Sequence, residues 1–281
     1  MNPTVAIVAQ GAMGSAVGRR LVERGLQVTT SLTGRSEASA QRARAAGMTA
    51  ASDEDVARAD FFLSIVPPAD ALSLAEKMAA LIARSNRKPI YVDCNAVNPP
   101  TKGNIARVIA ACGSPFVDVG IIGGPPAQGY EGPAIYASGQ DAARFAPLGN
   151  FGLDVRVIDG PIGAASALKM SYAGITKGLT ALASAMLLAA TREGAAEALQ
   201  AEFARSQPAL LAWLKRSVPS MFPKAYRFVG EMEEIADFVG KDEAARQIFE
   251  AFAKLYTRIA ADLDGKKEET GALAKFLDHN S

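Results

Sequence analysis

The first eighteen residues constrain the fold of this chain most strongly. Residues 4–9 are apolar or β-branched, which is typical of a strand that is buried on both faces. A Gln-Gly-Ala-Met-Gly turn follows, and residues 15–24 then have the spacing of an amphipathic helix. Backbone N–H groups at a helix start, together with the helix dipole, favour phosphate. The stretch therefore predicts a dinucleotide site, with the pyrophosphate at Gln10, Gly11, Ala12 and Met13.

The glycine motif itself is incomplete. Gly11 and Gly14 occupy the second and third positions of G-x-G-x-x-G, but Ala9 occupies the first. Such a turn often only reverses the chain. Its place between a buried-type strand and a helix favours the dinucleotide interpretation.

Length, charge and composition exclude several classes of protein. The chain has 281 residues, long enough for two domains, and a net charge of +1, which does not indicate nucleic acid or an anionic membrane as a partner. Two cysteines are too few for a disulfide framework. There is no export signal at the start and no uncharged run of about 18 apolar residues. We expect a cytoplasmic protein with no membrane span.

The only histidine is His279, close to the end of the chain. Histidine catalysis and histidine metal sites are therefore not expected, and no metal is predicted. Proton transfer must use a lysine, a tyrosine, a carboxylate or water.

The end of the second expected strand, residues 26–32, favours NADP over NAD. In dinucleotide folds an acidic residue here bonds the ribose 2′-hydroxyl, whereas an arginine accommodates a 2′-phosphate. This chain has Thr33, Gly34, Arg35 and Ser36 at that place and no acidic residue before Glu37. A guanidinium binds phosphate oxygens as a fork. The alternative is an ordinary turn, in which Ser36 caps the next helix and Arg35 lies in solvent.

Six strands alternating with five helices predict a doubly wound, mainly parallel sheet, followed by two more strands that flank a short helix at 141–148. Ligands of such sheets lie outside the carboxyl ends of the strands. Val66, Pro67 and Pro68 follow the fourth strand, and Asn95 follows the fifth. We expect these residues to line the same crevice as the glycine turn and Arg35.

The composition changes at Gly163. Residues 165–192 contain no proline and are rich in alanine, leucine and methionine, so they predict one helix about 42 Å long. Further helices are expected at 194–204, 207–218, 230–239 and 242–263. We therefore expect an α/β domain at 1–162 and an all-α domain at 163–281. The long helix carries an apolar stripe that one domain cannot easily cover, which favours a homodimer; its members are Leu168, Tyr172, Ile175, Leu179, Leu182, Met186 and Ala189.

Lys169, near the start of the long helix, is the candidate proton donor and acceptor. It follows an apolar, alanine-rich segment. A lysine held in apolar surroundings has a lowered pKa, because desolvation disfavours the ammonium. The alternative is a surface lysine whose ammonium reaches water.

Four motifs together resemble the β-hydroxyacid dehydrogenase superfamily, which includes 3-hydroxyisobutyrate and 6-phosphogluconate dehydrogenases. They are Ala9–Gly14, Val66–Pro68, Asp118–Gly124, and Gly163 with Lys169 six residues later. The resemblance implies a Rossmann domain that binds a nicotinamide cofactor, an all-helical domain for substrate binding and dimerisation, and a homodimer. It also implies a catalytic lysine at Lys169, which exchanges a proton with the substrate oxygen while hydride moves to or from the nicotinamide.

The chain departs from this family pattern near the substrate. Ile122, Gly123 and Gly124 occupy the place of its Ser-Gly-Gly loop, and Asn95-Ala96 the place of its Ser-Thr. Ala173 stands where the family usually has an asparagine. Thr176 and Tyr172 stand where 6-phosphogluconate dehydrogenase has its decarboxylation glutamate and a histidine. Sugar-phosphate decarboxylation is therefore disfavoured. Residues 172–182 and 224–234 are instead similar to a less characterised branch with a phosphogluconate-dehydrogenase-like C-terminal domain.

The predicted function is NADP-dependent hydride transfer at a hydroxyl or carbonyl carbon of a small, acidic substrate. Asn95, the 122–124 loop, Lys169, Tyr172 and Lys177 are the predicted substrate contacts. Lys177 is equally well explained as helix surface, and Lys224, Tyr226 and Arg227 as a basic turn before a helix. Imine reduction and a non-catalytic NADP-binding role are the alternatives.

Overall fold

The computed structural model describes residues 2–8, 11–130 and 132–278 and divides into two compact units, Met1–Lys169 and Met170–Ser281. The division falls inside the long helix, later than the boundary expected at 162/163. The reason is that the first turn of this helix is bonded to the sheet of the first unit.

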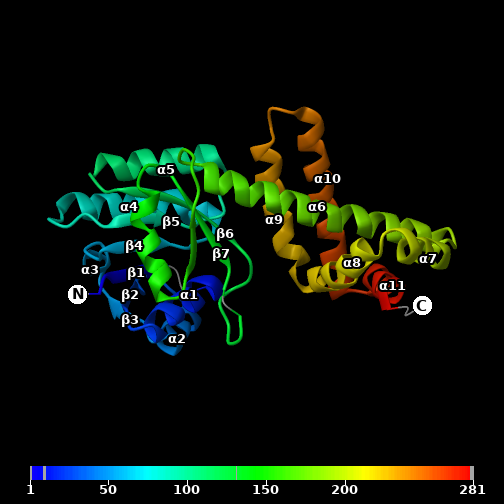
Figure 1. The fold of residues 1–281 in the computed structure, drawn as a ribbon, viewed down its shortest axis with the longest axis horizontal. Coiled ribbons are helices and arrows are strands. Elements are labelled where there is room, and N and C mark those ends of the chain that lie inside the picture. Colours follow the sequence, from blue (N-terminus) through cyan, green and yellow to red (C-terminus); the bar gives the residue numbers. More distant parts are fainter. Residues whose placement is uncertain (1, 9–10, 131, 279–281) are drawn as a thin grey trace. The chain divides into compact units, whose positions relative to one another are not determined.

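The first unit is built on one eight-stranded sheet (Figure 1). The strand order is β3-β2-β1-β4-β5-β6-β7-β8, and every pair is parallel except β6 with β7. The mainly parallel, doubly wound sheet predicted from the sequence is therefore confirmed. Its strands are β1 (Thr4–Val8), β2 (Gln27–Ser31), β3 (Thr49–Ala51), β4 (Phe61–Ser64), β5 (Ile90–Asp93), β6 (Phe116–Ile122), β7 (Ala134–Ser138) and β8 (Asp154–Val157).

Alternate side chains of the strands enter two separate cores. Val5 and Ile7 of β1 pack in the core that holds the buried face of α1, whereas Ala6 and Val8 pack in the core that holds α4 and α5. Both faces are apolar because helices cover both faces of a parallel sheet. The helices of this unit are α1 (Ala12–Glu23), α2 (Glu37–Ala45), α3 (Asp53–Val56), α4 (Ala71–Arg84) and α5 (Pro99–Ala111), with 3₁₀ turns at Pro68–Asp70, Ala142–Arg144 and Ala146–Phe151.

The short helix expected at 141–148 is present as 3₁₀ turns rather than as an α-helix. The structure has two 3₁₀ segments there, and the second ends at Phe151, followed by Gly152 as its C-cap with a φ of +85° in the left-handed region. Pro147 has no N–H for an α-helical bond, which explains the break.

The second unit is all-helical, as predicted. It consists of the greater part of α6 (Ala164–Arg192) followed by α7 (Ala196–Ser206), α8 (Pro208–Met221), a 3₁₀ turn (Phe222–Lys224), α9 (Ala225–Phe238), α10 (Glu243–Asp264) and α11 (Glu268–Asp278). The expected start of α9 at Gly230 was too late. Residues 225–229 are helical because Ala225 is buried in the core of this unit.

Helix α6 has 29 residues, a mean hydropathy of 1.4 in its most apolar window, and 39% of that window buried. By length and composition alone it is the one helix of the described residues that could cross a membrane. The core helix of a soluble protein passes the same test.

Candidate active site

The start of α1 presents backbone donors to the carboxyl edge of the sheet. Gly11 is the N-cap, and Ala12 and Met13 are the first helical residues. Among the described residues no side chain caps this helix, and its first turn contains no acidic residue. The cap site is exposed, so an anion can approach the N–H groups. These residues fit a pyrophosphate; Gln10, assigned to the same loop, lies outside the described residues.

The turn after β2 brings Arg35 close to an acidic residue. Gly34 has a φ of +70°, and the Ser36 hydroxyl accepts the N–H of Ser39 as the N-cap of α2. Thr33 is exposed and Arg35 half-buried. Partial burial raises the pKa of Asp53, but hydrogen bonds from Lys77 and Ser31 and the charges of Lys77 and Arg35 lower it overall. The Ser36 cap foreseen in the alternative interpretation is therefore present, and Arg35 lies near a carboxylate that Lys77 already binds at 2.6 Å.

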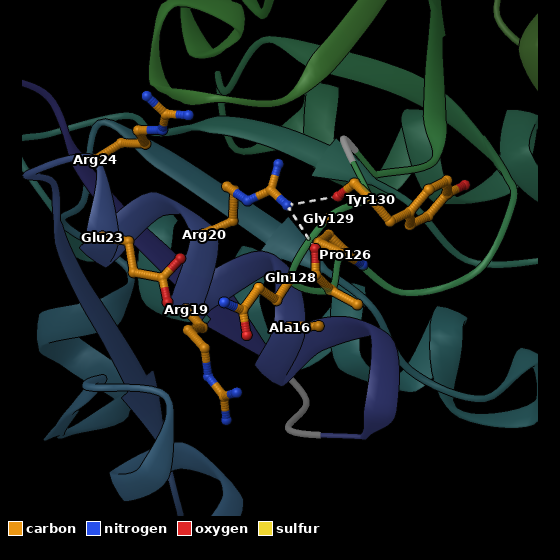
Figure 2. Close-up of a pocket in the computed structure, with 10 residues that line it drawn as sticks. Ala16, Arg19, Arg20, Glu23, Arg24, Pro126, Gln128, Gly129 and Tyr130 are labelled. Atoms are coloured by element: carbon orange, nitrogen blue, oxygen red, sulfur yellow. Dashed lines mark hydrogen bonds between the residues drawn. The ribbon is translucent and has the colours of Figure 1, made fainter.

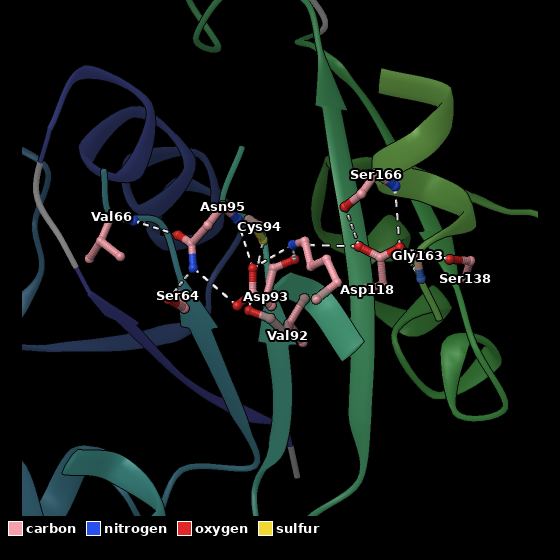
Figure 3. Close-up of polar contacts among 11 residues, drawn as sticks. Ser64, Val66, Val92, Asp93, Cys94, Asn95, Asp118, Ser138, Gly163 and Ser166 are labelled. Atoms are coloured by element: carbon pink, nitrogen blue, oxygen red, sulfur yellow. Dashed lines mark hydrogen bonds and ion pairs between the residues drawn. The ribbon is translucent and has the colours of Figure 1, made fainter. Parts of the chain in front are cut away.

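Asn95 joins the ends of β4 and β5 (Figure 3). Its Oδ1 accepts the N–H of Val66 at 2.7 Å, and its Nδ2 donates to Ser64 Oγ at 2.8 Å and to Asp93 Oδ2 at 3.1 Å. The side chain is buried, and both of its amide hydrogens are used. Asn95 and Val66 therefore lie together as predicted, but the carboxamide holds the strand ends rather than pointing outward. Pro67 and Pro68 remain exposed at this edge.

Asp118 of β6 binds the first turn of α6. Its Oδ2 accepts the N–H of Gly163 at 2.9 Å and of Ser166 at 3.2 Å, and its Oδ1 accepts the Ser166 hydroxyl at 2.7 Å. Ser138 of β7 donates to Asp118 Oδ2 and accepts the N–H of Ala165, each at 3.0 Å. The donors of this helix start are thus bound to side chains of the sheet instead of remaining open as in α1.

This attachment fixes Lys169 relative to β6. A Cβ placed on Gly120 would lie 3.2 Å from the Cβ of Lys169, so the lysine stem leaves the helix directly over this strand. Lys169 is half-buried, and its charge acts on the thiol of Cys94 just beyond β5. The candidate proton donor is therefore on the sheet face that also carries α4 and α5.

Sequence reasoning quoted Asp118 and Gly120 only as part of the Asp118–Gly124 motif and gave no role in the site to them, to Ser138 or to Ser166. A signal was present, because Asp118 is a charged residue and Gly120 a glycine inside the otherwise apolar strand 116–122. A buried charge requires partners, and a strand glycine often marks a close approach of another backbone. The partners, however, come from residues 20 to 48 positions away.

The predicted substrate loop continues from β6. Ile122 is half-buried at the strand end, and Gly123 and Gly124 are exposed. Gly123 has a φ of +127°, and a Cβ there would lie 2.7 Å from the hydroxyl oxygen of Tyr130. This residue is therefore restricted to glycine by its conformation and its surroundings.

The remaining predicted contacts belong to the second unit. Tyr172 is 53% exposed on α6. Lys177 forms an ion pair with Glu231 of α9, and its ammonium lies 4.4 Å from the ring centroid of Phe228. Its positive charge is therefore largely compensated within this unit. Lys224, Tyr226 and Arg227 are exposed, and the latter two lie on α9 rather than in a turn.

A pocket of about 650 Å³ lies elsewhere in the first unit, between α1 and residues 126–130 (Figure 2). Arg20 donates to the carbonyl oxygens of Tyr130 at 2.9 Å and Gly152 at 3.2 Å, so it holds these loops. Arg19 and Arg24 point in different directions and do not converge on one ligand. Lys169 does not line this pocket. Within the described ranges no group of three His, Cys, Asp or Glu side chains is placed to hold a metal ion.

Two family models match the chain. The NAD binding domain of 6-phosphogluconate dehydrogenase matches residues 4–147, more than half of the chain, and a domain of unknown function (DUF1932) matches residues 190–259. An uncharacterized 28.5 kDa protein of Methanothermus fervidus is 34% identical over 159 residues, which are 56% of this chain and 59% of that protein. The chain thus spans less than two thirds of this relative's length.

Similar solved structures agree with these two family matches. A conserved protein of unknown function, described as structurally similar to 3-hydroxyacid dehydrogenases, is 31% identical with a TM-score of 0.73, over 90% of this chain and 98% of that one. The 3-hydroxyisobutyrate dehydrogenase of Mycobacterium tuberculosis shares the fold, with a TM-score of 0.75 and 18% identity over 93% and 95% of the two chains.

Imine reductases share the fold more distantly. The enzyme of Myxococcus stipitatus in complex with NADP⁺ has a TM-score of 0.58 at 17% identity, over 98% of this chain and 100% of that one. A variant of it is in complex with NAD⁺. The mainly parallel sheet, the matched NAD-binding model and the 31% identical relative lead to one assignment: the chain belongs to the 6-phosphogluconate dehydrogenase-type NAD-binding family, within the β-hydroxyacid dehydrogenase superfamily of NAD(P)-dependent oxidoreductases.

Proposed function

We propose that this protein is an NADP-dependent oxidoreductase that interconverts a hydroxyl and a carbonyl group on a small, acidic substrate, with Lys169 as the general acid and base. The observation that carries the proposal is the placement of Lys169 over Gly120 by a helix whose first turn is bonded to Asp118 and Ser138. An acidic substrate is supported by two structural neighbours of this chain. One is described as similar to 3-hydroxyacid dehydrogenases, and the other is a 3-hydroxyisobutyrate dehydrogenase.

A bound nicotinamide supplies or accepts the hydride. The residues of this chain must bind the cofactor and move the proton. The open start of α1, at Gly11, Ala12 and Met13, would hold the pyrophosphate. Val66, Pro67 and Pro68 would line the cofactor, and Asn95 would hold their loop in place. In oxidation the Lys169 amine takes the hydroxyl proton as the carbonyl forms; in reduction the ammonium returns it to the oxygen.

The preference for NADP is supported by Arg35. It is half-buried beside the turn after β2, where a 2′-phosphate would lie, and Thr33 and Ser36 add hydroxyls. Lys77 pairs with Asp53 and thereby reduces the competition of this carboxylate for the guanidinium.

We further propose a homodimer in the cytoplasm. The stripe on α6 repeats at alternating spacings of three and four residues, as in a helix–helix seam. Ile175 is 72% exposed, and Leu182 and Met186 are 52% and 58% exposed. A partner subunit would bury them, and the second unit would then serve substrate binding and dimerisation.

The test is Lys169→Ala in purified protein, with Lys254→Ala, an exposed lysine of α10, as the control. We expect Lys169→Ala to lower turnover on its best hydroxyacid or keto acid substrate by about 10²–10⁴-fold, the usual range for an acid–base group. Its NADPH affinity should stay within about twofold of the unsubstituted protein. Turnover that survives the substitution would exclude Lys169 as the proton donor.

One observation keeps imine reduction as a second candidate. Tyr172 is exposed one helical turn beyond Lys169, and a tyrosine hydroxyl can also donate a proton. Cyclic imines and ketones are therefore offered to the same preparation. Preference for imines, lost in Tyr172→Phe and kept in Lys169→Ala, would support that activity. Tight NADPH binding without turnover of either class would support a non-catalytic binding protein.

A further inference from the structure

Lys102 of α5 is a charged residue with no access to solvent. Its ammonium pairs with Asp93 Oδ1, donates to the Asp93 carbonyl oxygen at 2.7 Å and lies 3.5 Å from Asp118 Oδ1. Burial by itself disfavours the charged amine, but the carboxylates of Asp93 and Asp118 more than offset this and raise the pKa of Lys102. The buried lysine therefore stays cationic at neutral pH.

The Asp118 carboxylate needs this cation. Both of its oxygens accept hydrogen bonds from the first turn of α6, an arrangement that suits an ionised carboxylate. An isolated buried carboxylate is strongly disfavoured unless a cation compensates it. Lys102 thus makes it possible for Asp118 to bind the start of α6.

The Asp93 carboxylate binds Asn95, on the opposite side of the proposed site from α6. Asp93 Oδ1 accepts the N–H of Asn95 at 3.0 Å, and Asp93 Oδ2 accepts the Asn95 side chain, which in turn binds the Val66 N–H. One ammonium therefore connects the strand-end loop assigned to the cofactor with the helix that carries the candidate proton donor.

Lys169 lies close to the same charges. Asp118 and Gly120 are two residues apart on β6, so their side-chain positions share one face of the sheet, and Lys169 leaves α6 over Gly120. Both lysines and both aspartates act on the buried Cys94 thiol. Among the described residues, Asp93, Lys102 and Asp118 act on the same thiol as Lys169, and these three side chains together carry one negative charge.

We propose that Lys102, Asp93 and Asp118 form one positioning unit for Lys169, which fixes the start of α6 on β6 and keeps a net negative charge near the Lys169 amine. The inference rests on the proposed function. Lys102 and Asp118 are positioning residues, because they act through Lys169 and the bound loop and do not touch the substrate.

The first test is Asp118→Asn, compared with Ser114→Ala. Ser114 is a buried serine of the same unit whose hydroxyl donates to the Pro89 carbonyl at 2.9 Å, outside the charge network. We expect Asp118→Asn to lower kcat by about 10- to 100-fold, the range seen when hydrogen-bond partners that orient metal ligands are lost. KM and NADPH affinity should change by less than about threefold. Ser114→Ala should lower the melting temperature but leave kcat unchanged.

A charge readout separates positioning from a general loss of stability. Removal of a nearby negative charge favours the neutral amine, so the limb of the pH–kcat profile that depends on Lys169 should move to lower pH in Asp118→Asn. Ser166→Ala, which loses only the hydroxyl bond to Asp118, is the milder variant in case Asp118→Asn does not fold. It keeps the charge and should lower kcat less without moving this limb.

The network can also be tested without a substrate. Lysine labelled with ¹³C reports the titration of the Lys169 amine, and Lys169→Arg identifies its signal. A lower midpoint in Asp118→Asn supports the network even if no turnover is found, in which case only the proposed reaction fails. An unchanged midpoint, or a fall in kcat that Ser114→Ala matches at equal loss of melting temperature, would overturn the inference.

Discussion

A Cβ placed on Gly120 would lie 2.4 Å from the carbonyl oxygen of Ala165. No side chain larger than hydrogen fits between β6 and the first turn of α6, because the obstacle is a backbone atom that cannot rotate away. The distance between this strand and this helix is therefore set by a glycine. Lys169 lies one turn further along α6, so its distance from the sheet depends on the same contact.

We predict that Gly120→Ala displaces the start of α6. Overpacking of this kind costs about 1–3 kcal/mol, so the melting temperature should fall, and kcat should fall with it because Lys169 moves. Gly103→Ala is the control. Gly103 is inside α5 with no atom within 4 Å of its Cβ position, so alanine should be neutral or stabilising there. Unchanged kcat in folded Gly120→Ala would show that the height of α6 does not matter for catalysis.

Arg35→Ala should weaken NADPH binding and leave NADH binding nearly unchanged. A hydrogen bond to a charged group contributes about 1.5–3 kcal/mol, which corresponds to roughly a 10- to 100-fold rise in the NADPH Kd. Fluorescence titration with both cofactors measures the ratio, and Arg107→Ala on the exposed side of α5 controls for general charge effects. Equal changes for NADPH and NADH would contradict the assignment of the 2′-phosphate.

Leu182→Glu should convert the proposed dimer into a monomer. Leu182 is 52% exposed in the middle of the α6 stripe, and burial of a carboxylate against an apolar partner is unfavourable. Light scattering after size-exclusion chromatography gives the mass. Ile248→Glu on α10, equally exposed at 52%, is the matched substitution outside the stripe and should keep the dimer. A monomeric unsubstituted protein would refute the dimer outright.

Asp262 should stabilise α11 in a pH-dependent way. Its carboxylate accepts the N–H groups of Glu268, Glu269 and Thr270 and the Thr270 hydroxyl. Although partial burial raises its pKa, these bonds lower it overall. A lowered folded-state pKa means that the stabilisation is complete above the unfolded-state pKa of about 3.9 and disappears as the pH falls through the folded-state value.

Asp262→Ala should therefore lower the free energy of unfolding by about 1 kcal/mol at pH 7, as expected for a lost helix cap. The difference from the unsubstituted protein should shrink below pH 4. Chemical denaturation at several pH values measures it, with the exposed neighbour Asp264→Ala as the control. A difference that stays constant down to pH 2 would rule out the carboxylate as its source.

Several elements of the fold could be read directly from the chain because local physics determines them. The apolar or β-branched residues 4–8 form β1 between two helix layers, and the long helix expected from Ala165 begins at Ala164. Errors arose where tertiary packing outweighed local signals. Pro219 indicated a helix end but lies inside α8, and buried Ala225 extends α9 toward the N-terminus.

The candidate site shows the same division. Its glycine turn and Arg35 are marked by residue type and by position relative to expected strands and helices, whereas the role predicted for Lys169 came from the resemblance to the β-hydroxyacid dehydrogenase superfamily. The partners of Lys177 and Lys102 were not predictable in this way. Lys177 had been an even choice between substrate contact and surface, and Glu231, 54 residues away, now pairs with it.

The sequence by itself therefore determined the class of fold, and it predicted the edge of the sheet for a dinucleotide and the lysine to test. Only the tertiary structure showed that Asp93 and Asp118 share one buried ammonium and that Gly120 sets the height of α6. Periodicity and propensity act over a few neighbouring residues, whereas burial of a charge is settled by atoms that meet only after the strands have paired.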